Sequence, residues 1–143
     1  MLKDLKRMFE CLVIGDSIAV GTHQYRQECL AYAKGGINTH QWNVKYRHEN
    51  LTAKTTIISL GTNDYPQIRT LVELNYMRGL VKSERVFWIM PPCNNKFCKP
   101  DINKWVEQVA KDWGDVIIST QKLQADAIHP SWAGYKELAE KTR

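Results

Sequence analysis

A serine, a histidine and an aspartate stand in positions from which they could act together on an acyl group. Ser17 follows Gly15 and Asp16 at the end of a short valine- and isoleucine-rich run, and Asp126 stands three residues before His129. A serine hydroxyl is a poor nucleophile until a base removes its proton, and a neutral imidazole oriented by a carboxylate can do this near neutral pH. These residue types therefore indicate acyl transfer through a hydroxyl nucleophile.

Each pattern alone also has a purely structural explanation. Asp16 or Ser17 could simply cap a helix, because aspartate and serine are residue types that start helices. A histidine followed by a proline, as in His129-Pro130, is more often a helix-start or surface residue. Only a fold that brings the two patterns together favours catalysis over these explanations.

Five short apolar runs alternate with helical segments and predict a parallel β-sheet. We expect strands at about residues 11–15, 28–33, 55–60, 85–90 and 115–119. We expect helices at about residues 39–48, 67–80, 101–113 and 131–140, and a helical or irregular segment from the first strand to about residue 26. This alternation is typical of an α/β fold, a three-layer α/β/α sandwich with helices on both faces of the sheet. Because no repeat or linker divides the chain, we expect one compact domain over residues 1–143.

The segment at residues 67–80 should bury an apolar side formed by Ile68, Leu71, Val72, Leu74 and Tyr76. At the strand ends stand Ser17, Gly35, Gly36, Asn63, Asp126 and His129. The carboxyl ends of parallel strands share one edge, where ligand chemistry gathers in open sheets. That edge would hold a nucleophile, a base, an orienting carboxylate and donors for an oxyanion.

Four local patterns follow one another in a fixed order along the chain: Gly-Asp-Ser at 15–17, Gly-Gly at 35–36, Gly-Thr-Asn-Asp at 61–64 and Asp-Ala-Ile-His-Pro at 126–130. With these patterns the chain resembles the SGNH hydrolases, also called GDSL esterases and lipases, from about residue 12 to 135. The resemblance implies the flavodoxin-like SGNH hydrolase fold. It also implies a serine esterase that uses no cofactor and no metal ion.

The resemblance further implies the roles of the catalytic residues. Ser17 would be the nucleophile, His129 the general base and Asp126 the carboxylate that orients the imidazole. The chain lacks the Gly-x-Ser-x-Gly elbow of α/β-hydrolases, because Ala19 stands at the final glycine position. It is also shorter than many relatives, which leaves little chain for a lid or a closed lipid-binding pocket.

The resemblance places an oxyanion hole at three points of the chain. The backbone N–H groups of Ser17 and Gly36 and the side-chain amide of Asn63 would donate to the oxyanion. Gly36 is preferred over Gly35 because family members usually carry a hydroxyl residue shortly after the contributing glycine, and Thr39 could be that residue.

Composition and charge restrict the partners. Apolar residues make up 43% of the chain and charged residues 24%, which is typical of a folded globular protein. The net charge of +5 is spread along the chain, so it favours an anionic partner such as a cell-envelope polymer without indicating nucleic acid. The expected substrate is a small-molecule or carbohydrate ester, and the sequence does not indicate an oligomeric state.

Two other functions stay open. The small size, basic charge and many aromatic residues would also suit a phage-type lytic enzyme that degrades peptidoglycan. Glycosidases usually need two carboxylates flanking the bond, and the sequence shows no such pair. The third alternative is a binding protein that keeps the fold without turnover.

Localisation and cysteine chemistry are linked expectations. The N-terminal segment has no sustained apolar core and no run approaches the roughly 18 residues of a membrane span. We therefore expect cytoplasmic residence, although release by another route stays open.

Free thiols are then expected: Cys11 and Cys29 as small buried residues, and Cys93 and Cys98 around a loop that could also close a disulfide. The latter pair offers too few nearby ligands for zinc.

Overall fold

The computed structural model describes residues 8–93 and 98–143. It contains a single parallel sheet with the strand order β2-β1-β3-β4-β5. The strands are β1 (Phe9–Gly15), β2 (Leu30–Ala33), β3 (Thr52–Ser59), β4 (Lys82–Ile89) and β5 (Val116–Ile118). This is the flavodoxin-like order, in which the connections run to opposite sides from the β1–β3 pair. The expected five-stranded parallel α/β fold is confirmed.

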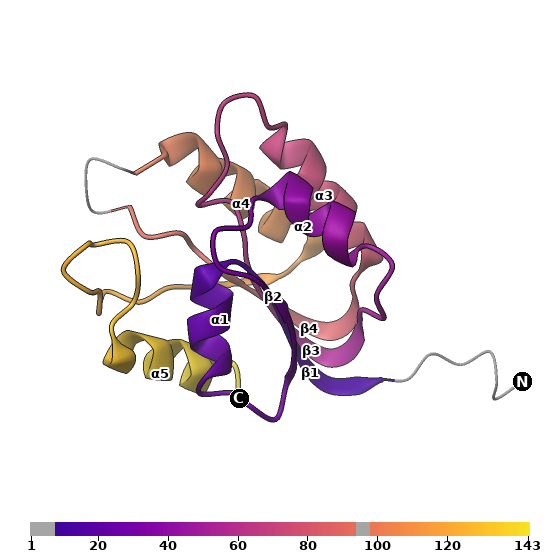
Figure 1. The fold of residues 1–143 in the computed structure, drawn as a ribbon. Coiled ribbons are helices and arrows are strands. Elements are labelled where there is room, and N and C mark those ends of the chain that lie inside the picture. The colour runs from indigo at the N-terminus through magenta and orange to yellow at the C-terminus, as the bar shows by residue number, and fades with distance from the viewer. Residues whose placement is uncertain (1–7, 94–97) are drawn as a thin grey trace, which may run out of the picture.

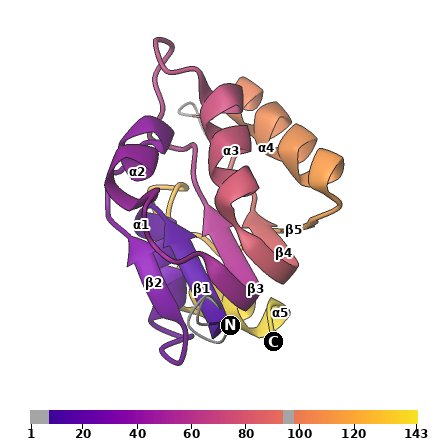
Figure 2. The same ribbon diagram turned by 90° about the vertical axis from the view of Figure 1, so that its right-hand side faces the viewer.

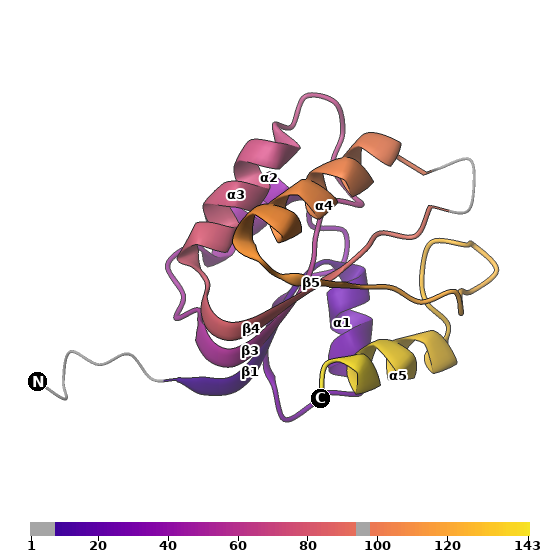
Figure 3. The ribbon, with the colours of Figure 1, turned by 180° about the vertical axis from the view of Figure 1, so that it is seen from behind.

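Helices cover both faces of the sheet (Figure 1). They are α1 (Ser17–His23), α2 (Thr39–Tyr46), α3 (Thr70–Leu80), α4 (Pro100–Trp113) and α5 (Trp132–Lys141). Helices α2, α3 and α4 lie on one face, and α1 and α5 lie on the other, as the views in Figures 2 and 3 agree. Among the described residues, no helix is long and apolar enough to cross a membrane.

The two faces of the sheet have separate apolar cores because side chains alternate along a strand. In β1, Leu12 and Ile14 belong to the core under α2, α3 and α4, whereas Val13 belongs to the core under α1 and α5. Trp42 and Trp88 are fully buried in the larger core. The core therefore fixes the central strands, whose carboxyl ends carry the candidate site.

The prediction for the buried side of α3 is partly wrong. Leu74 is buried, but Val72 is 54% and Tyr76 46% exposed. The buried face instead includes Arg78, whose guanidinium Nε and Nη2 donate to the two carboxylate oxygens of Asp115 over 2.7 and 2.9 Å. A buried charge is tolerated there because it is paired and hydrogen-bonded.

The expectation of free thiols is also wrong, because Cys11 is joined to Cys29 and Cys93 to Cys98 by disulfides. β1 and β2 are neighbours, and their register leaves the Cα atoms of Cys11 and Cys29 4.7 Å apart. In the second pair the Cα atoms lie 4.5 Å apart. Both separations are within the range that a disulfide spans.

Candidate active site

The turn after β1 presents Ser17 at the start of α1. Gly15 has a φ of +138°, and a Cβ atom there would lie 1.7 Å from the backbone oxygen of Ser59, so only glycine fits. The backbone N–H of Asp16 donates to that same oxygen over 2.9 Å. Asp16 then caps α1 by accepting the Ile18 N–H at 3.0 Å. A tight turn and a cap thus hold Ser17 half-buried at the carboxyl end of β1.

The loop between β5 and α5 carries the other two candidate residues. One carboxylate oxygen of Asp126 accepts the backbone N–H groups of Ile128 and His129, each over 2.9 Å. The Gln124 N–H donates to the His129 carbonyl over 2.8 Å and closes the loop. Asp126 and His129 are therefore held side by side by the backbone of their own turn.

Ser17, His129 and Asp126 form one chain of hydrogen bonds. Ser17 Oγ lies 2.9 Å from His129 Nε2, and His129 Nδ1 lies 2.7 Å from Asp126 Oδ2. The hydrogen bond from the His129 side chain and those from the backbone N–H groups of Ile128 and His129 lower the pKa of Asp126 to about 2. A carboxylate that is charged at neutral pH only accepts hydrogen bonds, so His129 Nδ1 carries the proton that faces Asp126. Nε2 can then accept from the Ser17 hydroxyl whenever it carries no proton itself.

The glycine pair after β2 lies next to the serine. A Cβ atom added to Gly35 would lie 3.9 Å from the Cβ atom of Ser17, and Lys34 N donates to Gly15 O over 3.0 Å. Gly36 has a φ of +77°, and a Cβ atom there would meet nothing within 4 Å. The Cα–Cβ direction of Gly35 thus points toward Ser17, whereas that of Gly36 points into open space.

Asn63 lies on the loop after β3, half-buried, and turns toward the glycine loop. Its Nδ2 donates to the Ile37 carbonyl over 3.1 Å. The side chain of Lys99, at the start of α4, donates to the carbonyls of Thr62 and Asp64, over 3.0 and 2.7 Å. These contacts fix the backbone on both sides of Asn63.

Asp64, for which the sequence indicates no separate role, connects the loop after β3 to the start of α2. Its buried carboxylate accepts the N–H and the hydroxyl of Thr39, over 2.8 and 2.6 Å, and the hydroxyl of Thr70 over 2.6 Å. Thr39 therefore contacts Asp64. The signal in the sequence is the Asp that ends the Gly-Thr-Asn-Asp pattern.

Asp16, for which the sequence indicates only a helix cap, also has unusual surroundings. It is fully buried, and burial raises its pKa to about 6. Its Oδ1 accepts from the Ser59 hydroxyl over 3.0 Å, whereas its Oδ2 has no partner among the described residues. Residue type alone does not reveal this burial, because it depends on how β1 and β3 pair.

A group of potential metal ligands occurs at Cys11, Glu28 and Cys29 within the described part of the chain. It lies at the opposite end of β1 from Ser17, and its two sulfur atoms are joined in a disulfide. A disulfide offers no thiolate to a metal ion.

The sequence matches no family model and no curated protein. Three solved structures share its architecture. An inferred acylhydrolase from Bacteroides fragilis aligns with a TM-score of 0.70 and 15% identity, over 96% of this chain and 88% of that chain. A catalytic mutant of the acetylxylan esterase Axe2 from Geobacillus stearothermophilus aligns with a TM-score of 0.62 and 18% identity, over 91% and 90% of the two chains.

The third is the C-terminal catalytic domain of peptidoglycan O-acetyltransferase A (OatA) from Streptococcus pneumoniae, with a methylsulfonyl adduct. It aligns with a TM-score of 0.62 and 17% identity, over 94% of this chain and 90% of that chain. In all three cases the alignment spans most of both chains. The chain therefore shares the fold of these three proteins, in keeping with the fold that the resemblance to the SGNH hydrolases implies.

Proposed function

We propose that the protein is a serine esterase that removes an acetyl or other short acyl group from a carbohydrate or another small, accessible ester. The observation that carries the proposal is the continuous hydrogen-bond chain from Ser17 through His129 to Asp126. Similarity to an acetylxylan esterase and to a peptidoglycan O-acetyltransferase supports an acetyl group on a polysaccharide.

In this mechanism Ser17 Oγ attacks the ester carbonyl carbon while its proton passes to His129 Nε2. The charged carboxylate of Asp126 holds the Nδ1–H and stabilises the imidazolium that forms. His129 then protonates the leaving alcohol as the C–O bond breaks, which leaves an acyl group on Ser17. Water attacks this acyl group with His129 as base, and the acid and free Ser17 are released.

The oxyanion of each tetrahedral intermediate needs donors that are already in place. We assign the backbone N–H groups of Ser17 and Gly36 and the Asn63 side-chain amide. An amide nitrogen has two hydrogens. The bond from Asn63 to Ile37 O occupies one and orients the other. Replacing Asn63 by Ala should lower kcat about 10²-fold to 10³-fold with little change in Tm.

The direct test of the nucleophile is labelling with a fluorophosphonate probe. Wild-type protein should be labelled, and Ser17→Ala should not be. A correctly folded wild type that remains unlabelled and hydrolyses no ester would contradict the proposal and favour a binding protein without turnover. A series of acetyl, butyryl and longer-chain p-nitrophenyl esters then tests the preference for short chains.

A second assay separates the proposed esterase from a lytic enzyme. Acetylated xylan and O-acetylated peptidoglycan are incubated with wild type and with Ser17→Ala. Release of acetate that depends on Ser17 supports the esterase. New reducing ends without acetate would instead indicate cleavage of glycosidic bonds.

A further inference from the structure

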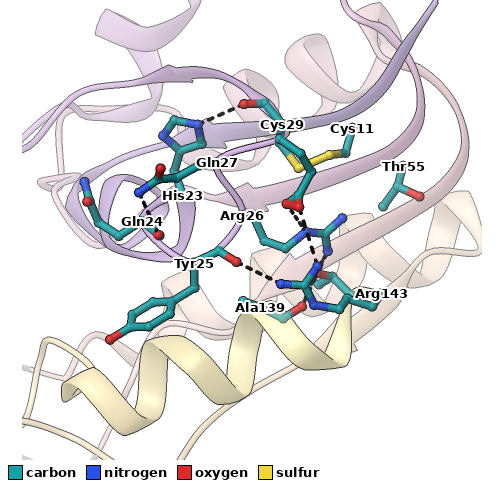
Figure 4. A network of polar contacts seen from close by, with 12 residues as sticks. Cys11, His23, Gln24, Tyr25, Arg26, Gln27, Cys29, Thr55, Ala139 and Arg143 are labelled. Carbon is teal, nitrogen blue, oxygen red and sulfur yellow. Dashed lines mark hydrogen bonds and ion pairs between the residues drawn. A yellow bond between two sulfur atoms is a disulfide. The ribbon is translucent and has the colours of Figure 1, made fainter.

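A cavity of about 520 Å³ lies between α5 and the end of α1 with the loop that follows it. Besides Gly21, it is lined by three aromatic residues and three glutamines, namely Tyr25, Trp132, Tyr135, Gln24, Gln27 and Gln124. None of these side chains carries a formal charge. Figure 4 shows three of the lining residues, Gln24, Tyr25 and Gln27, on the loop that faces α5.

The aromatic residues of this α1–α5 cavity are presented to a ligand in two ways. Trp132 is 81% exposed, so the hydrophobic core does not use its indole. The ring of Tyr135 is instead fixed against α1, because a Cβ atom added to Gly21 would lie 2.2 Å from its Cζ. A ring held like that of Tyr135 offers an apolar surface at little entropic cost.

Two of the glutamines have fixed amide orientations. Gln27 Nε2 donates to the Gln24 carbonyl over 3.1 Å, and Gln124 Nε2 donates to the Pro130 carbonyl over 3.0 Å. Each amide therefore keeps its oxygen as an acceptor for a hydroxyl group. Apolar faces combined with a few oriented polar groups are the features of a small-molecule site.

Two residues that line the cavity lie close in the chain to residues of the candidate active site. Trp132 stands three residues after His129, and Gly21 is about one helical turn, roughly 6 Å, from Ser17 along α1. Burial raises the pKa of Tyr135 to about 12, helped by the charges of Asp16 and Asp126, so this phenol stays a neutral donor and acceptor.

We propose that the α1–α5 cavity binds a neutral pyranose ring of the glycan whose ester is cleaved at Ser17. A pyranose has C–H faces that stack on aromatic rings and hydroxyl groups that pair with amides, and both kinds of partner line this cavity. The uncharged lining favours a neutral sugar over a uronic acid. The link to Ser17 rests on the proposed function, whereas sugar binding does not require turnover.

The test uses the full chain carrying Ser17→Ala, so that a sugar binds without being cleaved. Xylohexaose, chitohexaose and an oligogalacturonate of the same length are titrated by calorimetry. At least one neutral oligosaccharide should bind, and more tightly than the anionic one. Adding Trp132→Ala should weaken binding about tenfold, and Tyr25→Ala should do the same. Tyr76→Ala on α3, a 46% exposed tyrosine on the other face of the sheet, is the control and should bind normally.

Two results would overturn the inference: neither neutral oligosaccharide binds, or Trp132→Ala and Tyr25→Ala bind as well as the control, with circular dichroism confirming that all variants are folded. The proposed esterase is tested separately by p-nitrophenyl acetate and the fluorophosphonate probe on protein with Ser17 intact. Ester turnover without sugar binding contradicts only the proposal that the α1–α5 cavity binds a sugar. Sugar binding without turnover contradicts only the esterase.

Discussion

Asp16 and Asp126 both border Ser17, one through the backbone and the other through His129, but their surroundings are opposite. Asp16 is fully buried, and burial raises its pKa to about 6. The side chain of Asp126 is 42% exposed, and hydrogen bonds from His129 and the backbone lower its pKa to about 2. Asp16, which is next to Ser17 in the sequence, is therefore the less suited to carry a negative charge. Asp126, which is distant in the sequence, carries that charge.

The two carboxyl groups also affect stability in opposite directions. The folded-state pKa of Asp16 lies above its ordinary 3.8, so its stabilising contribution is present at low pH and is lost as the pH rises from about 4 through 6. The folded-state pKa of Asp126 lies below 3.8, so its contribution is present above about pH 4 and is lost as the pH falls toward 2. The windows do not overlap, and variants can separate them.

The largest effect is expected for Asp126→Asn. An amide in place of the carboxylate would no longer hold the Nδ1–H of His129, and Nε2 would lose its acceptor role toward Ser17. We expect kcat for p-nitrophenyl acetate to fall about 10²-fold to 10⁴-fold. Because solvent screens this exposed side chain and an amide oxygen can still accept the two backbone N–H groups, we expect Tm to fall only slightly.

Glu137→Gln is the matched control for this change. Glu137 lies on α5, and its pKa is also lowered to about 2, chiefly by the Lys122 side chain. Its carboxylate pairs with Lys122 and Lys141 and not with His129. The variant should keep wild-type activity. Equal losses in both variants would mean that general electrostatics, and not orientation of His129, explains the effect.

Asp16→Asn is expected to act on stability and its pH dependence. Asn retains an oxygen that can accept from Ile18 N–H and the Ser59 hydroxyl, and it cannot ionise. The free energy of unfolding of the variant, relative to wild type, should therefore be higher at pH 8 than at pH 5, by roughly 1 kcal/mol. Urea unfolding of both proteins at the two pH values measures this difference.

Asp126→Asn should behave differently in the same measurement. Asp126 is charged in both the folded and unfolded states above about pH 4, so its difference from wild type should be the same at pH 8 and pH 5. If the difference in unfolding free energy between Asp16→Asn and wild type were also the same at pH 8 and pH 5, burial would not raise the pKa of Asp16. The contrast between the two aspartates would then fail.

The parts of the molecule that the sequence predicted are those that local patterns determine. The β-branched run of β3 and the glycine that ends it indicate a buried strand, and five such runs with helices between them determine a parallel sheet. That topology by itself brings the loops after β1 and β5 to one edge. The contact between Ser17 and His129, 112 residues apart, needs only this edge and the short Asp126–His129 turn.

The parts that the sequence did not predict depend on pairing across the sheet or between distant elements. The Cys11–Cys29 disulfide requires the register of β1 with β2. The burial of Arg78 requires Asp115, which lies beyond α4. The raised pKa of Asp16 requires β3 to close over the turn after β1. None of these features leaves a periodic signal in the chain.

The smallest effect, and the one that most sharpens the contrast, is expected for Ser59→Ala. The Ser59 hydroxyl donates to Asp16 Oδ1 over 3.0 Å, and this bond lowers the pKa of Asp16 against the effect of burial. Hydrogen bonds to a charged group are stronger than those to a neutral one. Ser59→Ala should therefore destabilise the protein by about 0.5–1 kcal/mol more at pH 8 than at pH 5.

Ser83→Ala on β4 is the control. It removes a hydroxyl that pairs with the Thr56 hydroxyl over 2.6 Å and not with a carboxylate, so the loss of stability should not depend on pH. A pH-independent loss in Ser59→Ala as well would mean that Asp16 keeps one charge state from pH 5 to pH 8, contrary to a pKa of about 6. The Asp16→Asn comparison then tells the two cases apart: a difference that grows with pH means an uncharged carboxyl, and a constant difference means a charged one.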